Sequence, residues 1–115
     1  MRLGDAQRRF ALDVAKLIQY IYNCGYECTF GDAYRDPRSH GVMGKRSTYG
    51  RATSAHKQRL AIDLNLFLDG KYLSTTEAHR LFGEFWEGMT QDNVWGGRFT
   101  SPDGNHYSRR YNGIA

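Results

Sequence analysis

The sequence contains only two cysteines, Cys24 and Cys28, too few for a fold that depends on several disulfides. Three residues separate them, whereas the usual redox and zinc-knuckle motifs have two residues between their cysteines. We therefore expect two reduced thiols, with a shared metal site only as the minor alternative.

The sequence also lacks long apolar runs, repeats, low-complexity tracts and linkers. Its first ten residues, MRLGDAQRRF, reach charged residues too early for a signal peptide. Hydrophobic residues make up 40% and charged residues 24%, which is ordinary for a folded soluble chain and argues against membrane insertion. We therefore expect residues 1–115 to form a single domain, a monomer that is made in the cytoplasm.

The charge balance is positive. A net charge of +4 favours contact with anionic partners, which include nucleic acids, membrane surfaces and the acidic polymers of cell walls. The sign of the charge does not choose among these partners.

Two stretches have the periodicity of helices that pack one face on a core. In the first, residues 5–24, the apolar residues recur every three or four positions and Gly25 is placed to end the helix. The second is STTEAHRLFGEFWEGM, where Ser74 and Glu77 match a capping box. Its predicted apolar stripe consists of Leu81, Phe85 and Met89, with Phe82 and Trp86 beside it.

Strand patterns occupy much of the remaining chain. The segment YECTFGDAYR predicts a short strand that leads into a turn at Asp36-Pro37, and residues 38–53 form a long glycine-rich basic loop. In LAIDLNLFLDG, strict alternation places the leucines on one face and Asp63 on the other, before an Asp-Gly hairpin turn. The stretch VWGGRFTSPDGNHYS predicts a further hairpin. The expected fold class is α+β, with a small, mainly antiparallel sheet packed against two or more helices.

The four histidines differ in their surroundings. We interpret His79 as a half-exposed helix residue and His40 as a solvated residue of the basic loop. His56 lies seven residues before Asp63, and His106 lies three residues after Asp103. His56, Asp63 and His106 would provide the three protein ligands of a catalytic zinc ion. The competing interpretation makes Asp63 a solvated residue of an edge strand and leaves both histidines without a metal.

Two segments resemble one known family. SAHKQRLAID is similar to the S-x-H-x-x-G-x-A-x-D motif of the D-Ala-D-Ala metallopeptidase and hedgehog superfamily, and WGGRFTSPDGNHYS resembles the family's second block. AYRDP, further upstream, resembles the family segment whose arginine contacts the substrate. The order and spacing of these segments agree from Arg35 to Ser108.

The resemblance implies a hedgehog-like peptidase fold, one zinc ion per chain and a role for each matched residue. His56, Asp63 and His106 would bind the zinc ion, and Asp103 would act as the general base. Arg35 would stabilise the oxyanion that develops on the cleaved amide. Ser54 is assigned to the substrate site through its effect on the loop of His56. Apart from the resemblance, we assign Tyr107 to the substrate site as one of the aromatic residues of the C-terminal stretch.

The sequence departs from the family pattern at two positions. Arg59 stands where the motif has glycine, three residues after the first histidine. Asp103 stands where the vancomycin-resistance dipeptidases have glutamate, and aspartate there is similar to phage endolysins that cut the L-alanyl-D-glutamate bond of peptidoglycan. The resemblance therefore implies a phage-type endopeptidase that acts on the stem peptide and reaches the wall through a holin or a disrupted membrane.

Two other functions remain open at this point. A D-Ala-D-Ala carboxypeptidase or dipeptidase would use the same residues on a different bond. A basic domain that binds nucleic acid would use the eight tyrosines for stacking, but it leaves the ordered set of histidines and aspartates unexplained.

Overall fold

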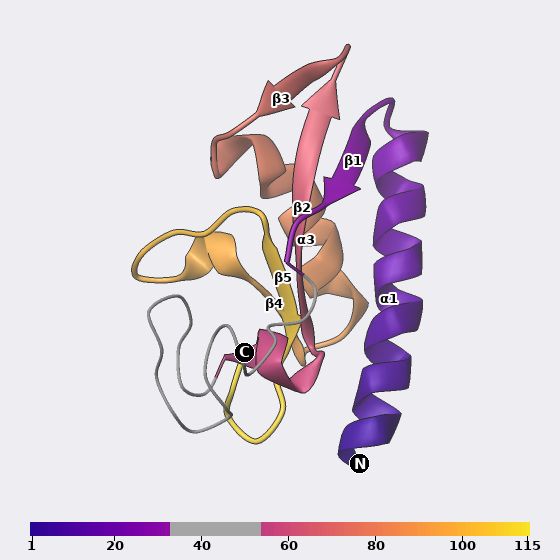
Figure 1. Ribbon diagram of the computed structural model, residues 1–115, viewed down its shortest axis with the longest axis vertical. Helices are drawn as coiled ribbons and strands as arrows, with labels where there is room; N and C mark the ends of the chain where they lie inside the picture. The colour runs from indigo at the N-terminus through magenta and orange to yellow at the C-terminus, as the bar shows by residue number, and fades with distance from the viewer. Residues whose placement is uncertain (33–53) are drawn as a thin grey trace.

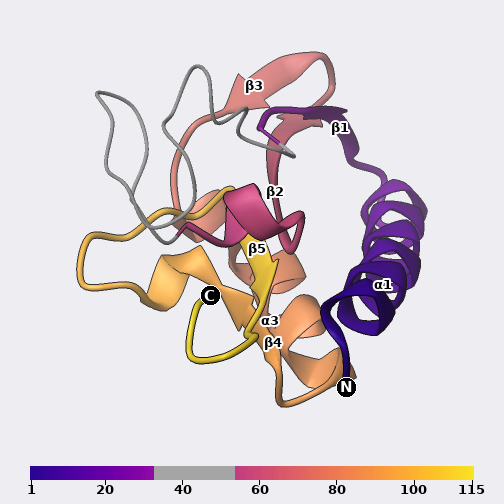
Figure 2. The same ribbon diagram turned by 60° about the horizontal axis from the view of Figure 1, so that its bottom comes forward.

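The computed structural model describes residues 1–32 and 54–115. The predicted turn at Asp36-Pro37, the loop of residues 38–53, Arg35 and His40 lie outside the described residues. In the described part, two α-helices pack with an antiparallel sheet of five strands, which confirms the predicted α+β class (Figures 1 and 2).

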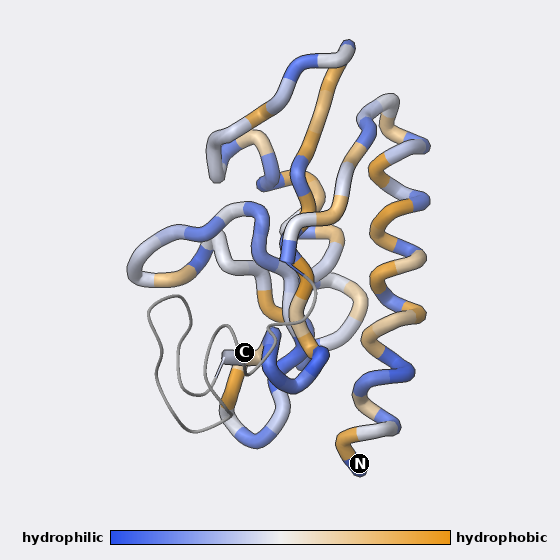
Figure 3. The backbone as a smooth tube through the Cα atoms, in the orientation of Figure 1, coloured by the Kyte–Doolittle hydropathy of each residue, from blue (hydrophilic) through white to orange (hydrophobic). Residues whose placement is uncertain are grey.

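The first helix, α1 (Leu3–Asn23), forms where its periodicity predicted it. Its buried face includes Phe10, Leu17 and Ile21, and hydrophobic and hydrophilic colours alternate along its course in Figure 3. Gly25, just beyond the end of the helix, has a φ of 86°, a conformation that glycine adopts without steric cost. The chain can therefore reverse direction into β1 (Glu27–Phe30).

The sheet is organised around β2 (Ala61–Leu68), and its main path runs β1-β2-β5-β4. After β2, Asp69 and Gly70 both have positive φ, as the predicted hairpin turn requires, and β3 (Lys71–Leu73) pairs back onto β2. The predicted C-terminal hairpin is formed by β4 (Asn93–Trp95) and β5 (His106–Arg109).

Alternation along β2 places the leucines on the face toward the core and Asp63 on the opposite face. Leu64 and Leu66 are fully buried in the core cluster, whereas the side chain of Asp63 keeps partial exposure on the opposite face. Figure 1 shows α3 behind the sheet and α1 along its side, while the short 3-10 helix η1 (Ala55–Gln58) lies in front. The charge in this apolar strand therefore does not enter the core.

The second helix differs from its prediction at its start and in its buried face. It begins with a 3-10 turn, η2 (Glu77–His79), and continues as α3 (Arg80–Met89). The predicted Ser74–Glu77 capping box is wrong, because the hydroxyl of Thr75 accepts the hydrogen bond from the backbone N–H of Ala78.

The predicted stripe is wrong at Leu81, which is 47% exposed. Phe85 and Met89 are partly buried against the core as predicted, and the fully buried face consists of Phe82, Gly83 and Trp86. Contacts with α1 set this face. The ring of Trp86 lies edge-on to Phe10 at 5.6 Å, and that of Phe82 lies edge-on to Tyr20 at 6.0 Å.

Within residues 1–32 and 54–115, no helix has both the length and the hydropathy that crossing a membrane requires.

Candidate metal centre

A short, capped turn positions His56. The Ser54 hydroxyl accepts a hydrogen bond from the backbone N–H of His56 at 3.2 Å, so Ser54 is the N-cap of η1. The turn ends at Arg59, which is left-handed with φ 58° and ψ 36°. The N–H of Leu60 then donates to the carbonyl of Ala55, and β2 begins. This compact turn holds the buried His56 ring in front of the sheet.

Strand pairing brings the other two predicted ligands together. Asp63 on β2 lies directly opposite His106 on β5 in the antiparallel register. Residues directly opposite each other in such a ladder have Cβ atoms about 5 Å apart and project to the same face. Residues separated by more than forty positions in the sequence thus meet beside His56.

The three side chains converge on one point. Oδ1 of Asp63 lies 3.2 Å from Nε2 of His56 and 3.6 Å from Nδ1 of His106. Within the described residues this is the one group of three such side chains that could hold a metal ion, and its ligand atoms lie within 4.8 Å of one another. Two ligand atoms about 2.0 Å from a tetrahedral zinc ion lie about 3.3 Å apart, so the observed spacing fits zinc.

The hydrogen-bonding state of these side chains also fits a metal ion. Nδ1 and Nε2 of His56, Oδ1 of Asp63 and Nε2 of His106 are buried and have no hydrogen-bond partner. Buried polar atoms are costly unless they are paired or coordinate a metal. Burial would raise the pKa of Asp63, but the neighbouring imidazoles of His106 and His56 outweigh it and lower the pKa to about 2. Asp63 is therefore anionic at neutral pH.

An open cavity of about 480 Å³ adjoins two of the three side chains, His56 and His106. Ser54, His56 and His106 contribute to its walls, and the exposed Asp103 lies on it as well. The carbonyl of Asp103 accepts the N–H of His106 at 3.1 Å, so one tight turn holds the predicted base beside a predicted ligand. This turn packs closely on Gly96, where an added Cβ would collide with the Asp103 carbonyl and with Cβ of His106.

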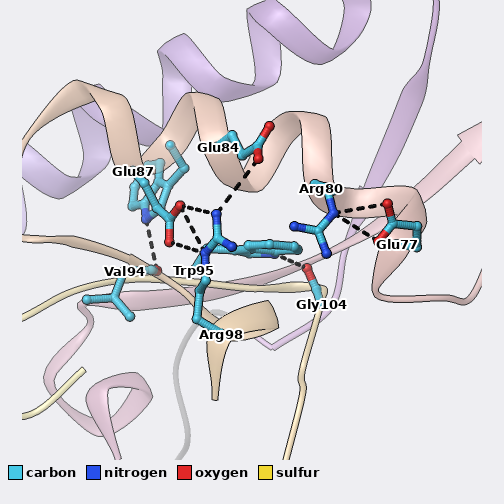
Figure 4. Close-up of polar contacts among 9 residues, drawn as sticks. Glu77, Arg80, Glu84, Glu87, Val94, Trp95, Arg98 and Gly104 are labelled. Carbon is cyan, nitrogen blue, oxygen red and sulfur yellow. Dashed lines mark hydrogen bonds and ion pairs between the residues drawn. The ribbon is translucent and has the colours of Figure 1, made fainter. Parts of the chain in front are cut away.

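A buried tryptophan anchors the loop that carries Asp103. The indole N–H of Trp95 donates to the carbonyl of Gly104 at 2.7 Å (Figure 4). The guanidinium groups of Arg98 and Arg80 lie 5.3 Å and 5.7 Å from the centre of the Trp95 ring. Figure 4 also shows Glu87 and Glu84 holding Arg98 and Glu77 holding Arg80. The Asp103 loop is thereby fixed to α3 through Trp95.

The backbone explains why the family motif has glycine at position 59. A left-handed conformation costs a residue with a Cβ about 1 kcal/mol or more, and glycine avoids that cost.

In a metal-free preparation, Arg59→Gly is expected to be about 1 kcal/mol more stable than Arg59→Ala. Both variants remove the arginine side chain, so urea unfolding of the pair isolates the backbone contribution. Equal stabilities would contradict this explanation.

Tyr107 and His79 lie elsewhere than their predicted roles suggest. Tyr107 is fully buried, and its hydroxyl lies 2.7 Å from Nδ1 of His79. Tyr107 does not line the cavity beside His56, so its position gives no support to the predicted substrate contact. The interpretation of His79 as half-exposed is wrong, because His79, at the N-terminal end of α3, is only 3% exposed. Burial lowers the pKa of His79 from 6.5 to about 4 and raises that of Tyr107.

The buried His79 makes stability depend on pH. Between pH 6.5 and about 4 the unfolded chain binds a proton at His79 that the folded chain does not, so stability falls as the pH is lowered. The loss across this window is expected to reach up to about 3 kcal/mol, and above pH 6.5 this contribution is constant. Urea unfolding in chelator, for the native chain and His79→Gln, measures it. An equal slope in both proteins would contradict this assignment.

The two cysteines and the C-terminal residues complete the comparison with the sequence predictions. Cys24 and Cys28 are free thiols and neither belongs to the group of His56, Asp63 and His106, so the minor alternative of a cysteine metal site finds no partner ligands in the described part of the chain. Sequence reasoning missed residues 113–115, which line the same cavity. The Asn112-Gly113 dipeptide was the available signal, because it is typical of tight hairpin turns.

Comparison with known proteins agrees with this geometry. No curated protein matches the chain. The sequence model of a family described as D-alanyl-D-alanine carboxypeptidase matches residues 48–109, more than half of the chain. The match includes His56, Asp63, Asp103 and His106. The predicted relationship is thus confirmed, and the chain belongs to this family of zinc peptidases.

Proposed function

We propose that the protein is a zinc-dependent peptidase that cleaves the stem peptide of peptidoglycan. The observation that carries this proposal is the convergence of His56, Asp63 and His106, each with a buried polar atom that makes no hydrogen bond. His56 and His106 line a cavity that Asp103 also lines. A purely structural site would satisfy the buried polar atoms with hydrogen bonds. The family membership supports the same reaction class.

The roles of the residues follow from their positions. His56, Asp63 and His106 would hold one zinc ion, which when bound supplies Lewis acidity that activates water at neutral pH. Asp103, on the wall of the same cavity, would accept the proton of the attacking water and later deliver it to the leaving amine. Ser54 would orient His56 by capping η1. Arg35, outside the described residues, keeps its predicted role of stabilising the oxyanion.

We further propose that the cleaved bond joins L-alanine to D-glutamate. An aspartate at position 103 is the feature that favours this endopeptidase over a D-Ala-D-Ala carboxypeptidase. The matched family is described as D-alanyl-D-alanine carboxypeptidase, so the carboxypeptidase is the second candidate. The proposed site of action is the cell wall, where both substrates occur.

Digestion of purified peptidoglycan distinguishes the two candidates. After digestion, labelling of new amino termini is expected to reveal D-glutamate, with no rise in free D-alanine. Release of terminal D-alanine alone would establish the carboxypeptidase instead.

The non-enzymatic alternative, a nucleic-acid-binding domain, is tested by metal analysis. Our proposal requires one zinc ion per chain and lower thermal stability in chelator. A preparation without stoichiometric zinc, and with unchanged stability in chelator, would favour the binding domain.

A further inference from the structure

The chain turns back on itself after β5. The N–H of Tyr111 donates to the carbonyl of Ile114 at 2.9 Å, and the N–H of Ile114 donates to the carbonyl of Tyr111 at 3.0 Å. Asn112 and Gly113, between them, have φ values of 50° and 78°, the paired positive values of a type I′ turn. Tyr111 and Ile114 are half-buried against the hydrophobic core. This turn is therefore held in one conformation by two backbone hydrogen bonds and by packing against the core.

The turn places the apolar side chain of Ile114 at the cavity beside His56. Ile114 lines the cavity together with His56, His106 and Asp103. Phe99 is a second apolar side chain on the same walls, with its ring centre 5.2 Å from that of His106. Figure 1 shows the end marked C brought back near η1, after the loop that follows β5. The cavity wall beside His56 and His106 thus includes apolar surface from Ile114 and Phe99.

The two apolar side chains differ in their relation to the family. Phe99 lies within the matched residues 48–109, whereas Ile114 and its whole turn lie beyond them. Ile114 therefore lies outside the part of the chain that the family model matches. A residue of this kind can adjust which substrate is accepted without changing the groups that carry out hydrolysis.

We propose that Ile114, held by its turn and facing the cavity with Phe99, forms an apolar wall that limits the size of the substrate side chain accepted next to the cleaved bond. This inference rests on the proposed peptidase function. Burying a methyl group against Ile114 is favourable, at about 0.8 kcal/mol per buried carbon. Burying a charged side chain there would remove its hydration without a partner. The wall would limit the length of the accepted side chain.

Two synthetic stem peptides test the role of this wall, one with alanine and one with leucine on the amino side of the cleaved bond. The native enzyme is expected to prefer alanine. In Ile114→Ala the wall is shortened, so the ratio of kcat/KM for alanine over leucine is expected to fall at least about 10-fold. Ile114→Val is a milder change and should move the ratio in the same direction. Leu12→Ala, which removes an exposed leucine on α1, is the matched control and should leave the ratio unchanged.

A binding measurement separates recognition from chemistry. In an Asp103→Asn background, calorimetry of the two peptides is expected to show the same change in preference when Ile114 is replaced by alanine. Native selectivity in Ile114→Ala, in both cleavage and binding, would overturn the role of this wall while the peptidase function stands. A native protein that neither binds nor cleaves the alanine peptide would overturn both.

Discussion

Asp103→Asn is expected to lower kcat about 10²- to 10⁴-fold, the range that general acid–base catalysis typically contributes. The amide keeps the shape of the side chain but cannot accept the proton of the attacking water. The turn that holds His106 uses only the backbone of Asp103, so the fold and the zinc content should remain native. Turnover of a soluble stem peptide and zinc content, both measured on the same preparation, test this division.

A matched control for Asp103→Asn is available in the hairpin turn between β2 and β3. Asp69→Asn makes the same chemical change at a site away from the metal cavity, and asparagine tolerates the positive φ of that position. It should keep native turnover. Near-native activity in Asp103→Asn would remove Asp103 from its role as base, and loss of zinc in that variant would mean that it acts as a ligand.

His56→Gln is expected to lose zinc affinity by at least about 100-fold, because changing groups that merely orient a ligand typically costs 10- to 100-fold. His56 provides one of the three converging donors, and it is buried where no other described side chain replaces it. Competition against a chromophoric chelator gives the affinity. Peptidase activity should disappear together with the metal.

His79→Gln is the matched control for the loss of zinc. This change also replaces a buried histidine, but His79 contacts Tyr107 and lies outside the group of converging donors. Its zinc affinity should remain native. Circular dichroism of both variants in chelator establishes that each is folded. Native zinc affinity in a folded His56→Gln would contradict the proposed centre.

The local pattern of apolar, polar and turn residues was sufficient to predict the main helices and strands. The alternation in β2 predicted which face Asp63 occupies, and the Asp-Gly dipeptide predicted the turn that follows, because strand geometry repeats every two residues and tight turns need positive φ. The periodicity of α1 likewise predicted its buried face. Each of these features depends on residues close together in the chain.

Apart from the capping box before α3, the failed predictions concern contacts between distant segments. The buried face of α3 depends on α1, which supplies Phe10 and Tyr20 as partners for the rings of α3. His79 was predicted to be half-exposed because its own segment does not reveal that Tyr107 will cover it. The cavity wall at Ile114 was missed for the same reason, since only the return of the chain after β5 brings it beside His56.

For the candidate site, too, the sequence predicted one part and the tertiary structure decided the other. The types and order of His56, Asp63, Asp103 and His106 were readable from the sequence, because zinc chemistry restricts which side chains can serve. Their convergence depends on the pairing of β2 with β5 and on the left-handed turn at Arg59. Chemistry is encoded in residue identity, whereas distances between remote residues arise only when strands pair and side chains pack. The sequence therefore named the candidate ligands, and the tertiary structure brought their ligand atoms to within 4.8 Å of one another.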